Sequence, residues 1–439
     1  MNSVRELYNW NPVFNMVMNI KDDYKKLGLR WIENNFEKWV DTLNRKEYNE
    51  FVESLQFNQK GDLLLIRYGL AEMQEGMWND KNSIFRECRS IVIDLHNEEI
   101  VVAPFRKFFN LNEVEENNMN NVIKEILNDN VIAVNFMDKL DGSMQTARFY
   151  NGKIHMFGSM ALSKDDSWRL EDGINLLTSG MKSMIEDCPD LTFIFEMITR
   201  RDAHVVNYGS EFEGLYLIGI RNTLTGQELS NHDLYIISEP YDVPMANPDF
   251  VWIRGIHSET RLIGEFKNLI NEATKKYKAD EKEGWVIEII KEDMSVRRVK
   301  LKCDDYVQIH RVLDRIASIN VVIHSLADGT YDDMISKVPD AHKERISAIK
   351  DESMRYARLK LEVSLRYVNY IRGEFTTLKD AMIYINGLNV VIRGIVRNIY
   401  LDNNDCNMLK SRTGKYKKIN EIREEMPILE ELKGEILWA

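Results

Sequence analysis

The sequence has few of the residues that mark special classes of protein. It contains only 8 prolines, and 44% of its residues are hydrophobic, which argues against collagen-like, mucin-like and disordered chains. No cysteine lies close to another, so the close pairs of zinc sites and disulfide scaffolds are missing. We therefore expect reduced, structural thiols at all four positions, Cys88, Cys188, Cys303 and Cys406.

Signals for a membrane or for export are also absent from the sequence. No stretch approaches the run of about eighteen apolar residues that a membrane span needs. The first residues, Met1 to Glu6, contain no basic region that leads into an apolar one. We expect a cytoplasmic protein with no membrane partner.

The chain has no surplus of positive charge. Its 58 Lys and Arg residues face 70 Asp and Glu residues, which gives a net charge of -12. Nucleic-acid-binding domains are commonly basic, so a polyanion would have to bind at a local patch. A length of 439 residues predicts two domains.

The pattern of apolar residues changes near residue 310. Before that point, short strand patterns dominate, and they are expected at 62–68, 89–95, 100–103, 131–136, 144–149, 153–157, 192–198, 214–220, 284–290 and 296–302. Helices are expected among them at 27–55, 168–185 and 261–277, and 117–121 is expected to be a polar loop. After that point, helical periodicity is almost continuous, at 306–326, 341–371, 378–385 and 419–432.

This order of elements predicts an α+β fold with antiparallel sheets flanked by helices, followed by an all-α domain. The first domain is expected over 1–310, with an N-terminal extension over about 1–60. The all-helical C-terminal domain is expected over 311–439.

The sharpest local motif follows the apolar strand 131–136 and reads Lys139-Leu140-Asp141-Gly142-Ser143. A lysine amine is a nucleophile only in its neutral form, which burial or neighbouring cations favour. Gly142 would allow close approach to a ligand, and Asp141 could orient a sugar hydroxyl or a metal-bound water. Taken alone, the motif is more typical of a polar turn that closes a hairpin.

Two carboxylates and two lysines interrupt other apolar strands. Glu196 and Glu283 are costly to bury without a partner, which indicates a cation, a metal or a ligand hydroxyl beside each. Lys300 and Lys302 alternate along a strand, so both amines share one face and could contact one polyphosphate. Exposed positions on solvated strands are the alternative for all four.

Upstream segments add Arg89, within Glu-Cys-Arg-Ser-Ile at 87–91, and Lys107, which precedes Phe108 and Phe109. Paired phenylalanines belong to a core more often than to a base-stacking platform.

In this order the segments resemble the covalent nucleotidyltransferase superfamily of ligases and capping enzymes. Within it, the sequence is most similar to the phage RNA ligase 1 family, over roughly 60–340. The most specific match is Lys-Phe-Phe-Asn-Leu-Asn-Glu at 107–113. The others are Glu-Cys-Arg-x-Ile at 87–91, Lys-x-Asp-Gly-Ser at 139–143, Phe-Glu at 195–196, Glu-Gly at 283–284 and Lys-x-Lys-x-Asp-x-Tyr-Val at 300–307.

The resemblance implies a role for each matched residue. Lys139 would attack the α-phosphorus of ATP and carry AMP covalently, and Glu196 would hold the ribose. Glu283 would support a metal or its waters, Lys300 and Lys302 would hold the phosphates, and Tyr306 would be needed for ligation. The remaining nucleotide contacts would come from Tyr68, Arg89, Lys107, Phe109, Asp141 and Gly142.

The function implied is ATP-dependent RNA ligation with Mg²⁺, for which Mn²⁺ could substitute. The enzyme would join 5′-phosphate and 3′-hydroxyl ends of single-stranded RNA or of nicked loops such as those of tRNA, through an adenylylated RNA 5′ end, in RNA or tRNA repair. Helices rather than a β-barrel after the last lysine motif favour the RNA ligase 1 branch. We expect a monomer, in the host cytoplasm if a phage encodes it. The alternative is a non-catalytic RNA-end-binding or virion-associated protein that keeps the fold.

A further match, Asp-Gly-Thr-Tyr-Asp-Asp at 328–333, resembles a family stretch whose paired acids serve a divalent ion. It assigns metal binding to Asp332 and Asp333, which also suit the N-terminus of a helix.

The sequence departs from the family at two site positions, and its N-terminus, between Met1 and Arg89, is longer than the family pattern. Phe157 or Gly158 stands where the family has a lysine, and Ala203 beside His204 stands where it has an arginine. Arg200 and Arg201 lie just upstream and could replace that arginine.

Overall fold

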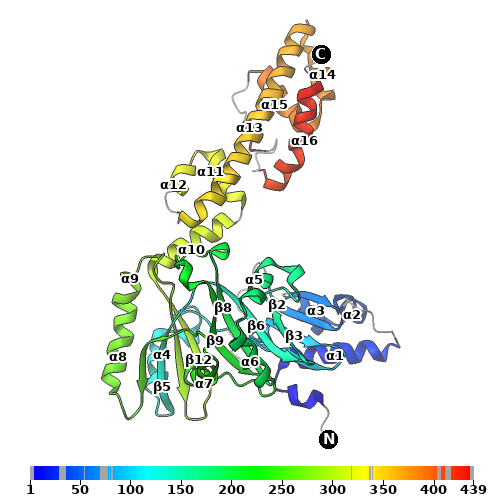
Figure 1. The fold of residues 1–439 in the computed structure, drawn as a ribbon. Helices are drawn as coiled ribbons and strands as arrows, with labels where there is room; N and C mark the ends of the chain where they lie inside the picture. Colours follow the sequence, from blue (N-terminus) through cyan, green and yellow to red (C-terminus); the bar gives the residue numbers. More distant parts are fainter. Residues whose placement is uncertain are drawn as a thin grey trace. The chain divides into compact units, whose positions relative to one another are not determined.

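A computed structural model describes residues 4–28, 36–53, 55–69, 78, 80, 83–317, 319–335, 338, 340–402, 407–410 and 417–435. The chain divides into two compact units, Met1–Tyr306 and Val307–Ala439. Helix α10 (Asp304–Ala317) begins in the first unit and continues into the second, so the expected boundary near residue 310 lies inside a helix (Figure 1).

The described part of the first unit is built on three four-stranded sheets, in which neighbouring strands pair antiparallel. The first sheet has the order β1 (Leu55–Lys60), β2 (Leu63–Tyr68), β3 (Arg89–Asp94), β4 (Glu99–Val102). The second has the order β10 (Pro248–Ile253), β5 (Val131–Asp138), β11 (Gly284–Lys291), β12 (Val296–Lys302). The third has the order β7 (Lys153–Phe157), β6 (Ser143–Tyr150), β8 (Leu191–Ile198), β9 (Gly214–Asn222).

The connection from β5 to β6 determines where the lysine motif lies. These consecutive strands belong to different sheets, so residues 139–142 carry the chain from the second sheet to the third. The expected α+β class with antiparallel sheets is confirmed.

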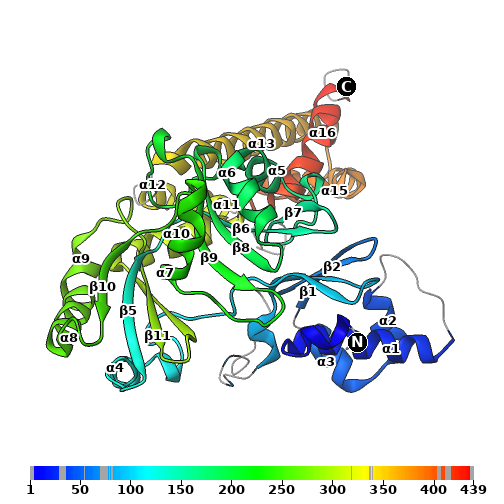
Figure 2. The same cartoon turned by 60° about the horizontal axis from the view of Figure 1, so that its bottom comes forward.

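Three N-terminal helices pack against the first sheet, namely α1 (Pro12–Lys26), α2 (Phe36–Leu43) and α3 (Lys46–Glu53) (Figure 2). Helix α1 starts sharply because the Asn11 side chain accepts hydrogen bonds from the N–H groups of Val13 and Phe14, at 2.9 and 3.0 Å. Its first residue is a proline, whose missing N–H costs nothing at that position. The helices share one apolar core with β2, β3 and β4, so the N-terminal extension is an integral part of the first unit.

Helices also cover the other two sheets. Beside the third sheet lie α5 (Trp168–Leu176), α6 (Ser179–Asp187) and α7 (Asn231–Ser238), whose apolar residues join one core with β6, β8 and β9. Near the second sheet lie α4 (Met119–Ile126) and α8 (Glu259–Asn268), and α8 continues through a π-helical turn, Leu269–Ala273, into α9 (Thr274–Lys276).

Several expected elements are wrong. The expected helix over 27–55 is replaced by two helices, α2 and α3, which are separated at Asn44, a residue with φ 45. Leu55 already begins β1. Residues 29–35 and 54 lie outside the described part. The expected helix over 168–185 breaks at Leu177, and Thr178 caps a new helix. The expected polar loop at 117–121 is wrong for 119–121, which begin α4.

Strand β10, helix α7 and helix α15 (Val390–Tyr400) were not expected. Strand β10 and helix α7 are short, and such segments gain their structure from packing, which periodicity does not report. Helix α15 is strongly amphipathic, so its pattern was present in the sequence and was missed.

The described part of the second unit is all helical, as expected. After α10 it consists of α11 (Ile319–Asp328), α12 (Tyr331–Ile335), α13 (Asp340–Glu374), α14 (Leu378–Gly387), α15 and α16 (Ile419–Glu435). Their apolar residues form a single cluster. Inside this unit, burial lowers the pKa of Lys360 to about 8, although Glu425 lies 3.7 Å away.

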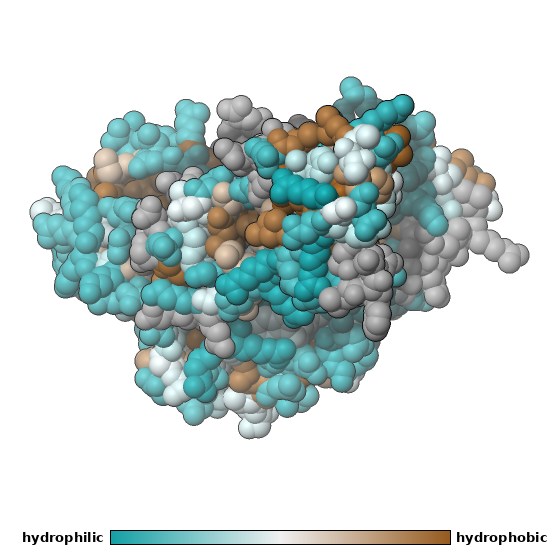
Figure 3. Space-filling model, turned by 90° about the horizontal axis from the view of Figure 1, so that it is seen from above, coloured by the Kyte–Doolittle hydropathy of each residue, from teal (hydrophilic) through white to brown (hydrophobic). Residues whose placement is uncertain are grey.

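Within the described ranges, no helix is long and apolar enough to cross a membrane. The face drawn in Figure 3 shows hydrophilic and hydrophobic residues side by side, with the hydrophilic ones covering most of it.

The N-terminal core offers a test of the claim that the extension is integral. Trp39 is 1% exposed and stacks on Tyr24, with ring centroids 5.3 Å apart. Replacing it by alanine should lower the free energy of unfolding by about 3–5 kcal/mol, because a buried aromatic is lost and a cavity remains. Denaturant unfolding followed by tryptophan fluorescence and circular dichroism would measure the change. Leu27→Ala, at a position 54% exposed, is the control and should stay close to wild type.

Candidate functional site

The site is centred on Lys139, directly after β5. Its backbone N–H donates to the carbonyl of Gly284 at 3.0 Å, which fixes the start of the connection between sheets. Its side chain is one-fifth exposed, and Nζ lies 2.6 Å from Oε2 of Glu283. Gly284 has φ 144, and a Cβ there would meet the carbonyl oxygen of Leu301 at 2.1 Å, so only glycine fits.

Glu283 is shared by two lysines. Its Oε1 lies 2.9 Å from Nζ of Lys302, and its side chain is 3% exposed. Burial alone would raise the pKa of Glu283, but the ammonium groups of Lys139 and Lys302 lower it overall. Burial alone would lower the pKa of Lys139, but the carboxylates of Glu283 and Glu196 raise it overall. Lys139 is therefore held as an ammonium ion and must lose a proton before it can act as a nucleophile.

A second carboxylate, Glu196 on β8, faces the motif from the third sheet. Gly142 donates its backbone N–H to Oε1 of Glu196 at 3.0 Å. A Cβ on Gly142 would lie 2.2 Å from the carbonyl oxygen of Met197, so the glycine permits this close approach. Burial raises the pKa of Glu196 to about 7, even though Lys139 acts to lower it.

Asp141 fastens the motif to the surrounding protein. Its Oδ2 accepts from the N–H groups of Val205 and Val206 at 2.8 and 2.9 Å, and its Oδ1 accepts from the Tyr306 hydroxyl at 2.7 Å. Its own N–H donates to the Tyr208 hydroxyl at 2.9 Å. Asp141 is 5% exposed, so its visible role is to hold the loop and Tyr306 in place.

Positive charges gather around Phe108. The Arg89 guanidinium lies 5.2 Å and the Lys300 amine 4.7 Å from the centre of its ring. Burial lowers the pKa of Lys300 well below its usual value, and Arg89, Lys139, Lys107 and Lys302 act in the same direction. A bound anion would relieve this crowding.

Lys107 lies among aromatic side chains next to these positive charges. Its Nζ donates to the Tyr68 hydroxyl at 3.3 Å and lies 4.7 Å from the centre of that ring and 5.5 Å from that of Phe109. The segment that follows is fixed to β12, because Lys300 donates its backbone N–H to the carbonyl of Phe109 at 2.9 Å.

A cavity of about 260 Å³ joins these groups. Its charged lining residues are Arg89, Asp138, Lys139, Glu196, Glu288, Arg298 and Lys300, and its apolar ones include Met137, Leu140, Met144, Leu217, Leu234 and Ala246. Apolar lining together with a few convergent charges suits a nucleotide, whose base is flat and apolar and whose phosphates are anionic.

The structure brings together most of the predicted site residues. Arg89, Lys139, Gly142, Glu196 and Lys300 line the cavity. Glu283 forms an ion pair with Lys139, and Lys302 forms one with Glu283. The other predicted residues contact one another nearby. Asp141 accepts a hydrogen bond from Tyr306, and Tyr68 accepts one from Lys107, whose amine also lies beside the Phe109 ring.

The predicted metal site is less complete. Asp332 is exposed on α12 in the second unit, and the side chain of Asp333 lies outside the described part. Among the described residues, no group of three or more His, Cys, Asp and Glu side chains could hold a metal. Both oxygens of Glu283 already face ammonium groups, so Mg²⁺ would need substrate phosphates and water as its main ligands, a common arrangement for this ion.

The positions that depart from the family have definite surroundings. Phe157 is a core residue, 1% exposed. Arg200 and Arg201 are exposed and pair with Glu213 and Asp172, at 2.5 and 3.1 Å, so within the described contacts neither reaches the cavity. Neither arginine therefore lines the cavity in place of the family arginine.

Sequence reasoning missed Asn231, which lines the cavity from the first turn of α7. Its side chain is largely buried, at 8% residue exposure, and Oδ1 has no hydrogen-bond partner among the described residues. The capping box of Ser230 and Asp233 marks a helix start in the sequence, but nothing there places that start against the cavity.

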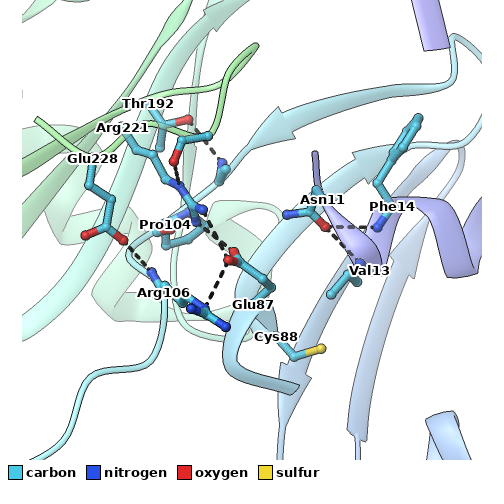
Figure 4. Close-up of polar contacts among 12 residues, drawn as sticks. Asn11, Val13, Phe14, Glu87, Cys88, Pro104, Arg106, Thr192, Arg221 and Glu228 are labelled. Carbon is cyan, nitrogen blue, oxygen red and sulfur yellow. Dashed lines mark hydrogen bonds and ion pairs between the residues drawn. The ribbon is translucent and has the colours of Figure 1, made fainter. Parts of the chain in front are cut away.

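A buried ion pair, shown in Figure 4, holds the segment that carries Lys107. Arg221 on β9 reaches both oxygens of Glu87, at 2.8 and 3.3 Å, and donates to the carbonyl of Pro104 at 2.8 Å. The Arg106 backbone N–H donates to Glu228 at 2.8 Å. Arg221 of the third sheet and Glu228, which follows that sheet, thus fix the connection from β4 towards Phe108 at Pro104 and Arg106.

Comparisons with known proteins agree with this geometry. A family model described as RNA ligase matches residues 87–306, half of the chain. A Thermovibrio ammonificans protein provisionally named an RNA ligase is 29% identical over 193 residues, 43% of this chain and 45% of that protein. The chain therefore spans less than half the length of this curated relative.

Solved structures similar to this chain include two RNA ligases. An archaeal ATP-dependent RNA ligase has a TM-score of 0.41 and 15% identity, over 73% of this chain and 79% of that one. Naegleria gruberi RNA ligase with PPi has a TM-score of 0.32 and 15% identity, over 44% and 55%.

The raised pKa of Glu196 predicts a pH dependence of stability. Between its ordinary pKa of 4.5 and about 7, the folded protein keeps a proton that the unfolded chain has released. The contribution of this group to stability therefore falls as pH rises through that window. Glu196→Gln should remove this contribution, so its melting temperature should fall less steeply with pH than that of wild type. The exposed Glu211→Gln is the control, and equal slopes in wild type and Glu196→Gln would contradict the assignment.

The Glu87–Arg221 pair predicts a non-additive response. Arg221→Met should destabilise the protein by about 3–5 kcal/mol, because Glu87 stays buried after losing its bidentate partner. The double variant Glu87→Met/Arg221→Met should be more stable than Arg221→Met alone, since no buried charge is left behind. Denaturant unfolding of wild type, both single variants and the double variant measures the coupling energy between Glu87 and Arg221. If the destabilisation of the double variant equals the sum of those of the two single variants, the prediction is wrong.

Proposed function

The chain belongs to the phage RNA ligase 1 family, and from this premise we propose that it is an ATP-dependent RNA ligase. It joins 5′-phosphate and 3′-hydroxyl ends of RNA through AMP linked to Lys139. The observation that carries the proposal is the position of the Lys139 amine. It lies on the wall of a cavity that has Arg89 and Lys300 for phosphates and apolar lining for a base.

In the first step, Nζ of Lys139 attacks the α-phosphorus of ATP. A nitrogen–phosphorus bond forms, and the bond to the bridging oxygen breaks, so that pyrophosphate leaves with the electron pair. The nearest acceptor for the lysine proton is Oε2 of Glu283, at 2.6 Å. Arg89, Lys107, Lys300 and Lys302 neutralise charge on the departing phosphates.

Asn231 supports the choice of ATP over GTP. Its buried Oδ1 has no partner within the described part of the chain and lies on the cavity wall, where it can accept a hydrogen bond from the exocyclic amine of adenine. Guanine carries a carbonyl at the corresponding carbon, which cannot donate, and would leave the Asn231 oxygen unsatisfied.

In the second step, AMP passes from Lys139 to the RNA 5′-phosphate. In the third, the 3′-hydroxyl attacks that phosphate, a phosphodiester bond forms and AMP leaves. Tyr306 is proposed to serve these later steps, since its hydroxyl is fixed by Asp141 at 2.7 Å beside the motif. The substrates proposed are single-stranded ends or nicked loops such as those of tRNA, in RNA or tRNA repair.

A divalent ion, Mg²⁺ or Mn²⁺, supplies charge neutralisation on the phosphates when it is bound. Glu283 is the residue proposed to orient its waters, because its carboxylate is kept ionised by two ammonium groups. Asp332 and Asp333 are proposed to serve a second divalent ion in the helical unit. The alternative role, an RNA-end-binding or virion-associated protein without catalysis, would leave the arrangement around Lys139 without a use.

The test is covalent labelling. Purified protein is incubated with Mg²⁺ and with ATP or GTP labelled at the α-phosphate, followed by denaturing electrophoresis. We expect a labelled protein with ATP and much less with GTP. Lys139→Ala should abolish labelling, and Asn231→Ala should reduce the preference for ATP about tenfold or more, because one buried hydrogen bond is lost.

Lys282→Ala is the matched control. Lys282 is also a largely buried lysine beside the motif, bonded to Asp138 and Asp249 at 2.7 and 2.9 Å, but it does not line the cavity. It should keep its label. If wild-type protein freed of bound AMP takes up no label, the ligase assignment fails and the RNA-end-binding role remains.

A further inference from the structure

A second cavity, of about 460 Å³, adjoins the nucleotide cavity, and we call it the basic groove. Phe108 and Arg298 line both cavities, so one ring and one guanidinium separate them. The cationic side chains that line the groove are Arg86, Arg106, Lys107, Arg221, Lys291, Arg297 and Arg298. The carboxylates that line it are Glu116 and Glu228, and three others that do not line it, Glu87, Glu125 and Glu288, form ion pairs with its cations.

Positive charge in the groove is only partly compensated. Burial lowers the pKa of Arg297, and the neighbouring Arg86 adds to this effect although Glu116 opposes it. Arg86 is 4% exposed, and its Nε atom has no hydrogen-bond partner in the described ranges. Lys291 and Arg297 share a single carboxylate, Glu125. An anion would be stabilised here by several cations at once.

The groove is open along a rim on which cations are spread out. Arg106, Lys291 and Arg297 are 40%, 30% and 24% exposed, and they come from the connection after β4 and from the hairpin of β11 and β12. The exposed side chains of Gln227 and Ser295 add neutral hydrogen-bonding groups. Separated cations along an open groove fit successive phosphates of a strand better than one compact ion.

We propose that the basic groove binds backbone phosphates of single-stranded RNA next to the end that is joined. This inference rests on the proposed function, which makes RNA the substrate. Of the cations that the proposed function assigns to the phosphates of ATP, Lys107 alone lines the groove, so the other groove cations are available to a second polyanion. Because the two cavities adjoin, a strand in the groove would bring its end towards the AMP on Lys139.

The experiment uses the full chain without ATP and a fluorescent single-stranded oligoribonucleotide with a 5′-phosphate and a blocked 3′ end. Anisotropy gives the affinity at several salt concentrations. Arg297→Gln and Lys291→Gln should each weaken binding about three- to tenfold at low salt. They should also reduce the slope of log K against log salt by about 0.7, the value for one phosphate contact on a single strand. Labelling by ATP should stay within about twofold of wild type, because neither residue lines the nucleotide cavity.

Arg254→Gln is the matched control. Arg254 is 28% exposed, pairs with Glu259 at 3.3 Å and donates to backbone carbonyls, much as Arg297 does, but it does not line the groove. If the groove variants bind RNA as Arg254→Gln does, the proposal is overturned. It is also overturned if they lose ATP labelling while binding RNA normally, since the groove would then serve the nucleotide.

Failure of the proposed function gives a different pattern. Wild-type protein would then take up no label from ATP, whereas the RNA affinities of wild type and the groove variants would still differ.

Discussion

The ion pairs of Glu283 with Lys139 and Lys302 are the interaction on which the site depends. A carboxylate that is 3% exposed could not stay ionised there without two ammonium groups, at 2.6 and 2.9 Å. In turn, it keeps Lys139 positively charged and fixed in place. Lys139 is therefore held in its protonated form, in which an amine is not a nucleophile, and a polyphosphate that drew Lys302 away would leave Glu283 to Lys139 alone.

The site exists because three separate sheets meet around it. The second sheet supplies Glu283, Lys300 and Lys302, the third supplies Glu196, and the first supplies Arg89. Lys139 lies on the link between two of them. The contact of Glu87, just before β3, with Arg221 of the third sheet therefore helps to hold these groups together.

Sequence patterns predicted the strands well because most of them are short apolar runs bounded by turns, and the lysine motif lies where its strand ends. Order along the chain also brought Lys139, Glu196, Glu283 and Lys300 into one hypothesis. The patterns could not show that Asp141 would turn to Val205, Val206 and Tyr306, because those partners are distant in sequence. Asn231 was missed for the same reason. Asn44 interrupts an expected helix because its φ is positive. Asparagine tolerates such a φ, but an asparagine in a sequence does not predict one.

Helix α10 anchors the lysine motif through its first turn. The helix begins at Asp304, and its third residue, Tyr306, donates to Asp141 in the motif. Successive turns of a helix are bonded to one another, so the backbone of Tyr306 cannot rotate independently. The phenol hydroxyl of Tyr306 is therefore restrained from two sides, by the helix and by the carboxylate of Asp141. A change at the start of α10 would displace the phenol and loosen the motif, although it alters neither Tyr306 nor Asp141.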